Sequence, residues 1–154
     1  MYYADDFNIM AWLVDMNDQE SAAMIKSVSY GNDEIQQVSE EYMDSVNVEL
    51  MKAGARGISV LFASGDMGVW GRTGYARDPD RFHPDFPAGS PYVTAVGGTD
   101  FNEKSVIGAE ASWVSSGGGF SDHFARPEWQ ADAVAGYKST GERAKRASLV
   151  ERDK

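Results

Sequence analysis

The apolar residues of this chain follow a helical period in two segments near its beginning. From Phe7 to Met16 they recur three or four positions apart, which predicts a helix. The same spacing from Ile35 to Leu50 predicts a longer amphipathic helix. Asn32 or Asp33 is a plausible cap for its first turn, and Gly57 follows its end.

A short β-type run over 26–30 and short apolar runs over 58–62 and 92–96, each next to turn residues, predict strands. The order strand, helix, strand with a short loop after the helix predicts a parallel pair joined by a right-handed crossover. The run 92–96 is expected to be a third buried strand, and a helix is expected over 128–137, after a proline. The fold class is therefore α/β.

Composition narrows the range of functions. The chain has 154 residues and a formal net charge of −10, which argues against non-specific binding to nucleic acid or to an anionic membrane. It contains no cysteine, which excludes disulfides, zinc–thiolate sites and cysteine nucleophiles. No apolar run has the length of a membrane span, and the first residues show no signal-peptide pattern.

One motif places a carboxyl group where chemistry is common. Ser64-Gly65-Asp66-Met67-Gly68 directly follows the strand predicted over 58–62. In open α/β sheets, ligands bind at the carboxyl ends of the strands. Asp66 is thus a candidate functional residue, although a capping role in the following turn is the more common explanation for an aspartate in such a motif.

Five sequence segments occur together in a fixed order, and this ordered set is far more specific than any one of them. They are Ser-Val-Ser-Tyr-Gly at 27–31, Phe-Ala-Ser-Gly-Asp-Met-Gly at 62–68, the Phe-Pro-Ala-Gly-Ser-Pro-Tyr run within 86–99, Ser-Gly-Gly-Gly-Phe-Ser at 116–121 and Phe-Ala-Arg-Pro at 124–127. The set resembles the central part of the sedolisin family, the serine-carboxyl peptidases, over about residues 7–138.

The resemblance implies a subtilisin-like parallel sheet flanked by helices, present here as an incomplete, central part of the catalytic domain. Residues 1–138 would form this partial domain, and residues 139–154 would be a divergent, disordered basic tail. It further implies serine-type hydrolysis of peptide bonds in acid, and a lysosomal or secreted location.

The resemblance also assigns roles to seven residues. Asp66 corresponds to the aspartate that supports the family's oxyanion hole. That role requires a protonated carboxyl, since an ionised one would repel the oxyanion, and a free aspartic acid has a pKa of about 3.9. The strip that would pair with a substrate backbone is Ser29, Tyr30 and Gly31. The wall of the S1 pocket would be Ala63, Ser64 and Gly65.

Other parts of the family's machinery are not found in this sequence. Its catalytic glutamate and aspartate lie upstream of the matched segment, and its nucleophile lies in a Gly-Thr-Ser motif that this chain does not contain. Glu40 and Asp44 imitate the spacing of the acidic pair but are expected to be solvated helix charges. The family's calcium site is also absent, so no metal or cofactor is expected, and His83 and His123 are expected to be surface or loop histidines.

The chain alone is therefore expected to be inactive. The family resemblance implies that its binding partner is a peptide substrate. A second interpretation is a non-catalytic module that binds peptides, the missing parts of the peptidase domain, or a second copy of itself. A nucleotide-binding domain is a distant third, because Gly31 is followed by Asn32, Asp33 and Glu34, acidic residues where phosphates would lie. No nucleic-acid or membrane partner is expected.

Overall fold

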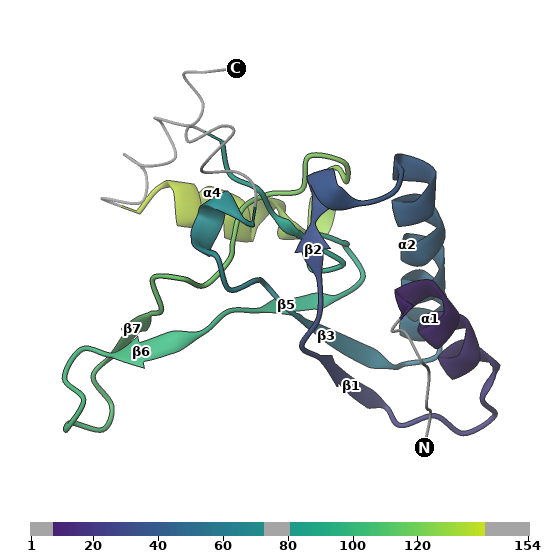
Figure 1. Cartoon of the computed structure of the whole chain (residues 1–154), viewed down its shortest axis with the longest axis horizontal. Coiled ribbons are helices and arrows are strands. Elements are labelled where there is room, and N and C mark those ends of the chain that lie inside the picture. The colour runs from purple at the N-terminus through teal and green to yellow at the C-terminus, as the bar shows by residue number, and fades with distance from the viewer. Residues whose placement is uncertain (1–7, 73–80, 141–154) are drawn as a thin grey trace.

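A computed structural model describes residues 8–72 and 81–140 of the chain. Its centre is a three-stranded parallel sheet in the order β1–β3–β5 (Figure 1). The strands are β1 (Ile25–Val28), β3 (Ser59–Ala63) and β5 (Thr94–Val96). The predicted α/β class and all three predicted strands are confirmed, although β5 is shorter than the predicted run.

The register of the sheet determines which segments lie next to each other where the strands end. Val28, the last residue of β1, is paired with Phe62, and Ala63 at the end of β3 is paired with Val96 at the end of β5. Because parallel strands point the same way, their carboxyl ends meet at one edge. The segments after β1 and β3 therefore run side by side.

Two helices pack against the sheet and enclose the core. α1 (Ile9–Asp18) and α2 (Glu40–Ala55) lie side by side, with α2 linking β1 to β3 (Figure 1). The buried apolar side chains come from both helices, from β3 and the residue before it, and from one phenylalanine further along the chain. They are Ile9, Leu13, Met16, Met43, Val46, Leu50, Ala53, Ile58, Val60, Phe62 and Phe86. The helix predicted over 7–16 is confirmed from Ile9 onward, and Phe7 lies outside the described residues.

The long helix begins later than the sequence pattern predicts. Glu34–Gln36 form a separate 3₁₀ turn capped by Asp33, and α2 begins only at Glu40 with Ser39 as its N-cap. Ile35 is 58% exposed and Val38 is 83% exposed. Both side chains fit the apolar spacing of the helix, but they do not face the core. The predicted start of the helix and its predicted cap were therefore wrong.

Replacing Ser39 by alanine is expected to lower the free energy of unfolding by about 1 kcal/mol, because the Ser39 hydroxyl accepts the N–H of Tyr42 at 3.1 Å. Val38→Ala, one residue earlier and exposed, is the matched control and is expected to change stability by less than about 0.5 kcal/mol. Urea unfolding measures both. A larger loss from Val38→Ala than from Ser39→Ala would contradict this helix boundary.

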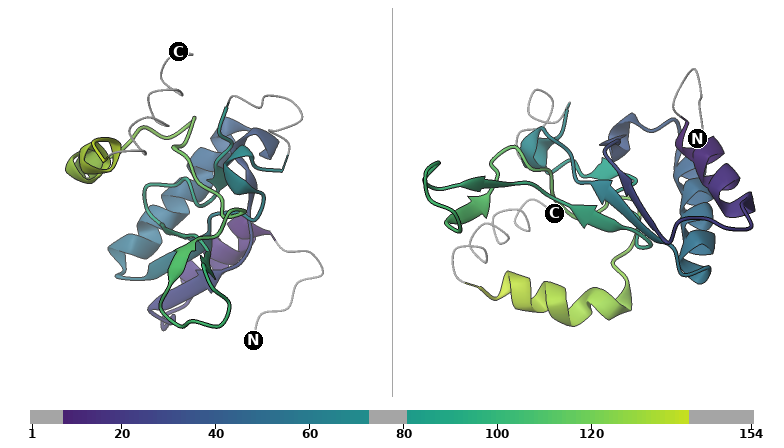
Figure 2. Two further views of the ribbon diagram at one scale, coloured as in Figure 1. Left: turned by 90° about the vertical axis from the view of Figure 1, so that its left-hand side faces the viewer. Right: turned by 90° about the horizontal axis from the view of Figure 1, so that it is seen from below.

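The second half of the chain is more open. β2 (Asn32–Asp33) pairs antiparallel with β4 (Asp85–Phe86), and β6 (Thr99–Phe101) pairs antiparallel with β7 (Glu110–Ser112). Figures 1 and 2 show β6 and β7 at the end of the molecule opposite α1, with α4 (Ala131–Lys138) apart from the other two helices. The helix predicted over 128–137 is confirmed; it opens with a 3₁₀ turn at Glu128–Gln130.

The third strand is not buried as predicted. All three residues of β5 are exposed, and the side chain of Val96 keeps 47% of its surface accessible. β5 lies at the edge of the sheet, and the described helices α1 and α2 pack on β3 rather than over β5. The apolar run 92–96 therefore predicts the strand correctly but not its burial.

Within the described residues no helix is long and apolar enough to cross a membrane. Residues 141–154 of the predicted tail lie outside the described residues.

Candidate peptide-binding site

The predicted site residues meet at the carboxyl edge of the sheet. Ser29, Tyr30 and Gly31 follow β1, and Ser64, Gly65 and Asp66 follow β3, so the parallel pairing of these strands brings the two segments together. Gly31 is buried, whereas Ser29, Tyr30 and Asp66 are exposed. The edge thus presents two neighbouring segments of backbone with an accessible carboxyl group beside them.

A third segment, the glycine-rich stretch after Trp113, lies along the turn that follows β3. The N–H of Gly117 donates to the carbonyl of Gly65 at 2.8 Å, and the hydroxyls of Ser64 and Ser116 are 3.4 Å apart. The Ser116 hydroxyl also accepts the N–H of Gly98 at 2.9 Å. Hydrogen bonds therefore join the ends of β3 and β5 to residues 116–117, which begin the Ser-Gly-Gly-Gly-Phe-Ser motif.

Gly117 has no room for a side chain. A Cβ added to it would lie 1.8 Å from the Ser64 carbonyl oxygen, a backbone atom that cannot move away independently. Gly117→Ala is therefore expected to separate the two segments, to break the hydrogen bond to Gly65 and to cost about 2–3 kcal/mol. Gly136→Ala, where an added Cβ meets nothing within 4 Å, is the matched control. Equal thermal midpoints for the two variants would contradict the close approach.

The structure adds a residue that the sequence did not single out. Asp85 of β4 is directly opposite Asp33 of β2, and both are buried, with exposures of 7% and 0%. Asp33 accepts the N–H of Arg72 with both carboxylate oxygens, at 3.1 and 2.8 Å. The Arg72 guanidinium donates to the Gly31 carbonyl at 3.1 Å. A network of two acids and one arginine thus lies behind the end of β1.

Asp85 is the residue of this edge whose ionisation is most altered. Burial raises the pKa of its carboxyl to about 7, and Asp33 and Asp66 add to the rise, whereas the Arg72 guanidinium lowers it. Loss of water disfavours the charged form of a carboxyl group, and neighbouring negative charges do the same. At acid pH this edge of the sheet therefore contains a neutral carboxyl group.

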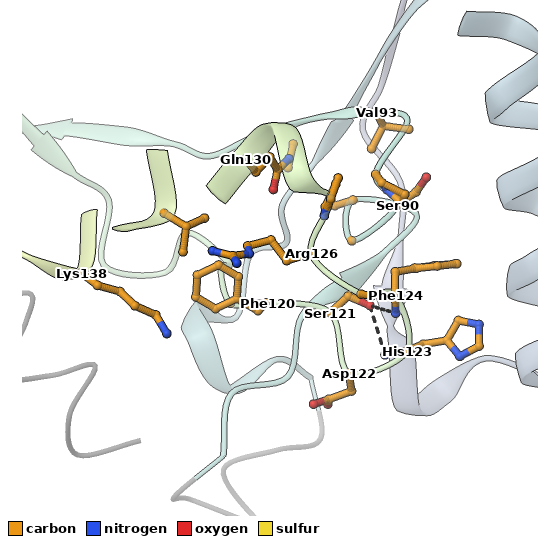
Figure 3. A pocket seen from close by; sticks show the side chains of 18 residues that line it. Ser90, Val93, Phe120, Ser121, Asp122, His123, Phe124, Arg126, Gln130 and Lys138 are labelled. Atoms are coloured by element: carbon orange, nitrogen blue, oxygen red, sulfur yellow. Dashed lines mark hydrogen bonds between the residues drawn. The ribbon is translucent and has the colours of Figure 1, made fainter. Parts of the chain in front are cut away.

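Glu34 joins the edge to a distant loop. The Glu34 carboxylate accepts hydrogen bonds from the hydroxyl of Ser121 at 2.5 Å and from the N–H of Asp122 at 2.9 Å. Glu34 is only 7% exposed. The Ser121 hydroxyl in turn accepts the N–H groups of His123 and Phe124 (Figure 3). This contact was not predicted from the sequence, because its partners are separated by more than half of the chain.

The two histidines that were expected to be surface or loop residues are in different environments. His83 lies in a loop, but it is buried there, with 7% exposure. His123 is mostly covered, and its Nε2 lies 2.7 Å from the carboxylate of Asp44, with Glu40 3.9 Å from Nδ1. Glu40 and Asp44 are themselves 79% and 63% exposed, consistent with solvated helix charges. The described residues contain no cluster of three or more metal-ligating side chains.

A separate hollow lies between β5, the loop 119–127 and α4 (Figure 3). Its volume is about 810 Å³, and Figure 3 shows Phe120, Arg126, Gln130 and Lys138 around it. None of the predicted site residues lines it. The hollow therefore does not belong to the edge that carries Asp66.

Comparison with known proteins gives this edge a context. No protein-family model matches the chain. The chain is 45% identical to human tripeptidyl-peptidase 1 over 133 residues, and 46% identical to the mouse protein over 128 residues. These alignments cover 85% and 82% of this chain but only 23% and 22% of the relatives.

A solved structure gives the same result for the fold. Pseudomonas sedolisin, a serine-carboxyl proteinase complexed with two molecules of pseudo-iodotyrostatin, matches with a TM-score of 0.62 and 25% identity. The match covers 81% of this chain and 36% of sedolisin. The subtilisin-like architecture predicted from the motifs is confirmed, and it is incomplete.

These findings define the class: the chain carries a segment of the sedolisin family of serine-carboxyl peptidases. Within that family its sequence is similar to tripeptidyl-peptidase 1. The chain spans about a quarter of the length of these curated relatives.

Proposed function

We propose that this chain is the peptide-binding and oxyanion-stabilising segment of an acid-acting serine-type peptidase. The observation that carries the proposal is the convergence of the ends of β1 and β3, which places Ser29–Gly31, Ala63–Gly65 and Asp66 at one edge. The similarity to tripeptidyl-peptidase 1 and to sedolisin supports the same conclusion. Peptides are the proposed substrate class.

The proposed division of labour follows from the backbone. Ser29, Tyr30 and Gly31 would pair with an extended substrate as an added strand, so that main-chain hydrogen bonds supply affinity. Ala63, Ser64 and Gly65 would form one wall of the pocket for the residue before the cleaved bond. A neutral Asp66 carboxyl would donate a hydrogen bond to the oxyanion of the tetrahedral intermediate, which explains why acid is required.

The 154-residue chain would not catalyse this reaction alone. It contains no Gly-Thr-Ser motif to supply the nucleophile, and Glu40 and Asp44 contact His123 rather than the edge that holds Asp66. By family the proposed location is lysosomal or secreted. This segment would need no cofactor, since the calcium site of the complete peptidases is expected outside it.

A non-catalytic binding module is the second candidate, and the exposure of β5 favours it. All residues of this edge strand are exposed, and an open edge can pair with a strand from another chain. Other parts of a peptidase domain or a second copy of this chain would fit there. Concentration-dependent association, measured by analytical ultracentrifugation, would support this candidate.

A segment exchange tests the peptidase proposal. The 133 matched residues of human tripeptidyl-peptidase 1 are replaced by the corresponding residues of this chain, and hydrolysis of an amino-terminal tripeptide substrate is measured near pH 4. We expect the chimera to be active and the isolated chain to be silent under the same conditions. A folded but inactive chimera would refute the proposed function, and turnover by the isolated chain would refute its proposed inactivity.

A further inference from the structure

Two buried carboxyl groups face each other behind the peptide-binding edge. Asp33 and Asp85 are direct partners in the antiparallel β2–β4 bridge, and almost no solvent reaches either residue. Like charges directly opposite on paired strands destabilise the pairing, and a carboxylate removed from water is costly unless it is neutralised. The bridge therefore favours a state in which one of the two groups is neutral.

The hydrogen bonds show which group keeps the charge. Both oxygens of Asp33 accept the backbone N–H of Arg72, an arrangement that suits an ionised carboxylate. Hydrogen bonding with the Asp33 side chain is one of the causes that raise the pKa of Asp85. Since a hydrogen bond between two carboxyl groups needs one proton, that proton belongs on Asp85.

The same carboxyl group touches both walls of the edge. A Cβ added to Gly31 would lie 3.2 Å from Asp85 Oδ2, and one added to Gly65 would lie 3.0 Å from the same oxygen. Asp85 therefore packs against the segment after β1 and against the turn after β3. A change in its charge acts on both segments at once.

We propose that Asp33 and Asp85 share one proton that holds the segments after β1 and β3 together, so that this edge is assembled in acid and loosens when Asp85 ionises. Asp85 is thus a positioning residue rather than a catalytic one. Among the described residues, the charged groups that act on Asp85 are Asp33 from β2, Asp66 from the turn after β3, and Arg72. The proposal concerns the folded chain itself and does not depend on the proposed peptidase activity.

The direction of the pH dependence follows from proton linkage. The pKa of Asp85 is about 7 in the folded chain, against about 3.9 for an aspartic acid in an unfolded one. Between these values the folded state binds more protons, so the free energy of unfolding falls as the pH rises. The contribution is complete below about pH 4 and is lost as the pH passes 7.

Thermal unfolding of the 154-residue chain at pH 4.5 and pH 7.5 tests this coupling. Asp85→Asn replaces the protonated carboxyl by an isosteric amide that donates to Asp33 at either pH. From pH 4.5 to pH 7.5, the melting temperature of wild type is expected to fall on the order of 10 °C further than that of Asp85→Asn. Asp15→Asn, an exposed acid on α1, is the control and is expected to keep the wild-type difference.

Two further readouts report on the proton and on the segments themselves. NMR of the chain with ¹³C-labelled aspartate carboxyls is expected to show one group titrating near pH 7, absent in Asp85→Asn and shifted toward acid in Asp33→Asn. Hydrogen exchange at Gly31 and Gly65, corrected for its intrinsic pH dependence, is expected to be at least about tenfold faster at pH 7.5 than at pH 4.5 in wild type only.

Either of two results would overturn the inference. One is the titration of every aspartate near pH 4, and the other is the same pH-dependent loss of melting temperature in Asp85→Asn as in wild type. Neither measurement uses a substrate, so an inactive chimera would leave this inference standing, and an active one would not rescue it.

Discussion

In the active chimera, Asp66→Ala is expected to lower kcat by about 10²–10³, with a smaller change in KM. The Asp66 carboxyl is exposed at the turn after β3, beside the backbone that would hold the substrate. An oxyanion-hole donor stabilises charge that develops only in the transition state, so its loss reduces kcat by about this factor. Steady-state kinetics with a tripeptide substrate near pH 4 measures the effect.

The matching control is Asp100→Asn, which alters an exposed aspartate on β6, away from the edge that carries Asp66. This variant is expected to keep the rate of the parent chimera within about twofold, since surface changes away from a site have small effects. Asp66→Asn separates charge from hydrogen bonding, because an amide donates at any pH. We expect it to retain more activity than Asp66→Ala, and full activity of Asp66→Ala would remove Asp66 from the proposed mechanism.

Phe62→Ala is expected to cost about 3–5 kcal/mol of unfolding free energy. Phe62 on β3 is 1% exposed, and its ring meets that of Trp12 edge-on at 6.4 Å, so the truncation leaves a cavity between the sheet and α1. Domains of this size have total stabilities of about 5–15 kcal/mol. The variant is therefore expected to be close to unfolding at room temperature.

Phe101→Ala makes the same chemical change on a strand of the exposed hairpin, where Phe101 is 44% exposed. Its expected cost is below about 1 kcal/mol, because little apolar surface returns to water. Urea unfolding followed by far-UV circular dichroism compares the two variants. Similar midpoints for both would show that the core is not centred on β3.

The sequence predicted those parts of the fold that depend on local patterns. The apolar spacing of α1 and the short apolar run of β3 are visible in the sequence over a few neighbouring residues, although the side chains that they pack against are distant in the chain. Ile35 and Val38 caused the start of α2 to be predicted too early, because these exposed apolar residues continue the helical period of the buried ones. The amino-acid composition of β5 indicates a strand. Whether that strand is buried depends on the elements that pack over it, and the sequence of the strand itself contains no information about them.

The candidate site was predictable only in part, for the same reason. Ser-Gly-Asp-x-Gly marks a strand end by itself, so Asp66 was accessible from the sequence. Asp85 was not, because its significance arises from Asp33, a residue that the sequence suggested only as a helix cap. The signal that could have found it is the acid directly before Phe86-Pro87, at the beginning of a motif already singled out.

The contact of Glu34 with Ser121 also sets an order of events during synthesis. Most of the core lies within residues 9–62, whereas the partner of Glu34 comes 87 residues after it. Chains are made from the amino terminus, and distant contacts carry the larger loop-closure cost. A nascent chain that has emerged only as far as β5 can therefore bury α1, α2 and β3 while the Glu34 carboxylate still lacks its hydroxyl. The 3₁₀ turn that carries the buried Glu34 is therefore completed only after residues 121–122 have been synthesised.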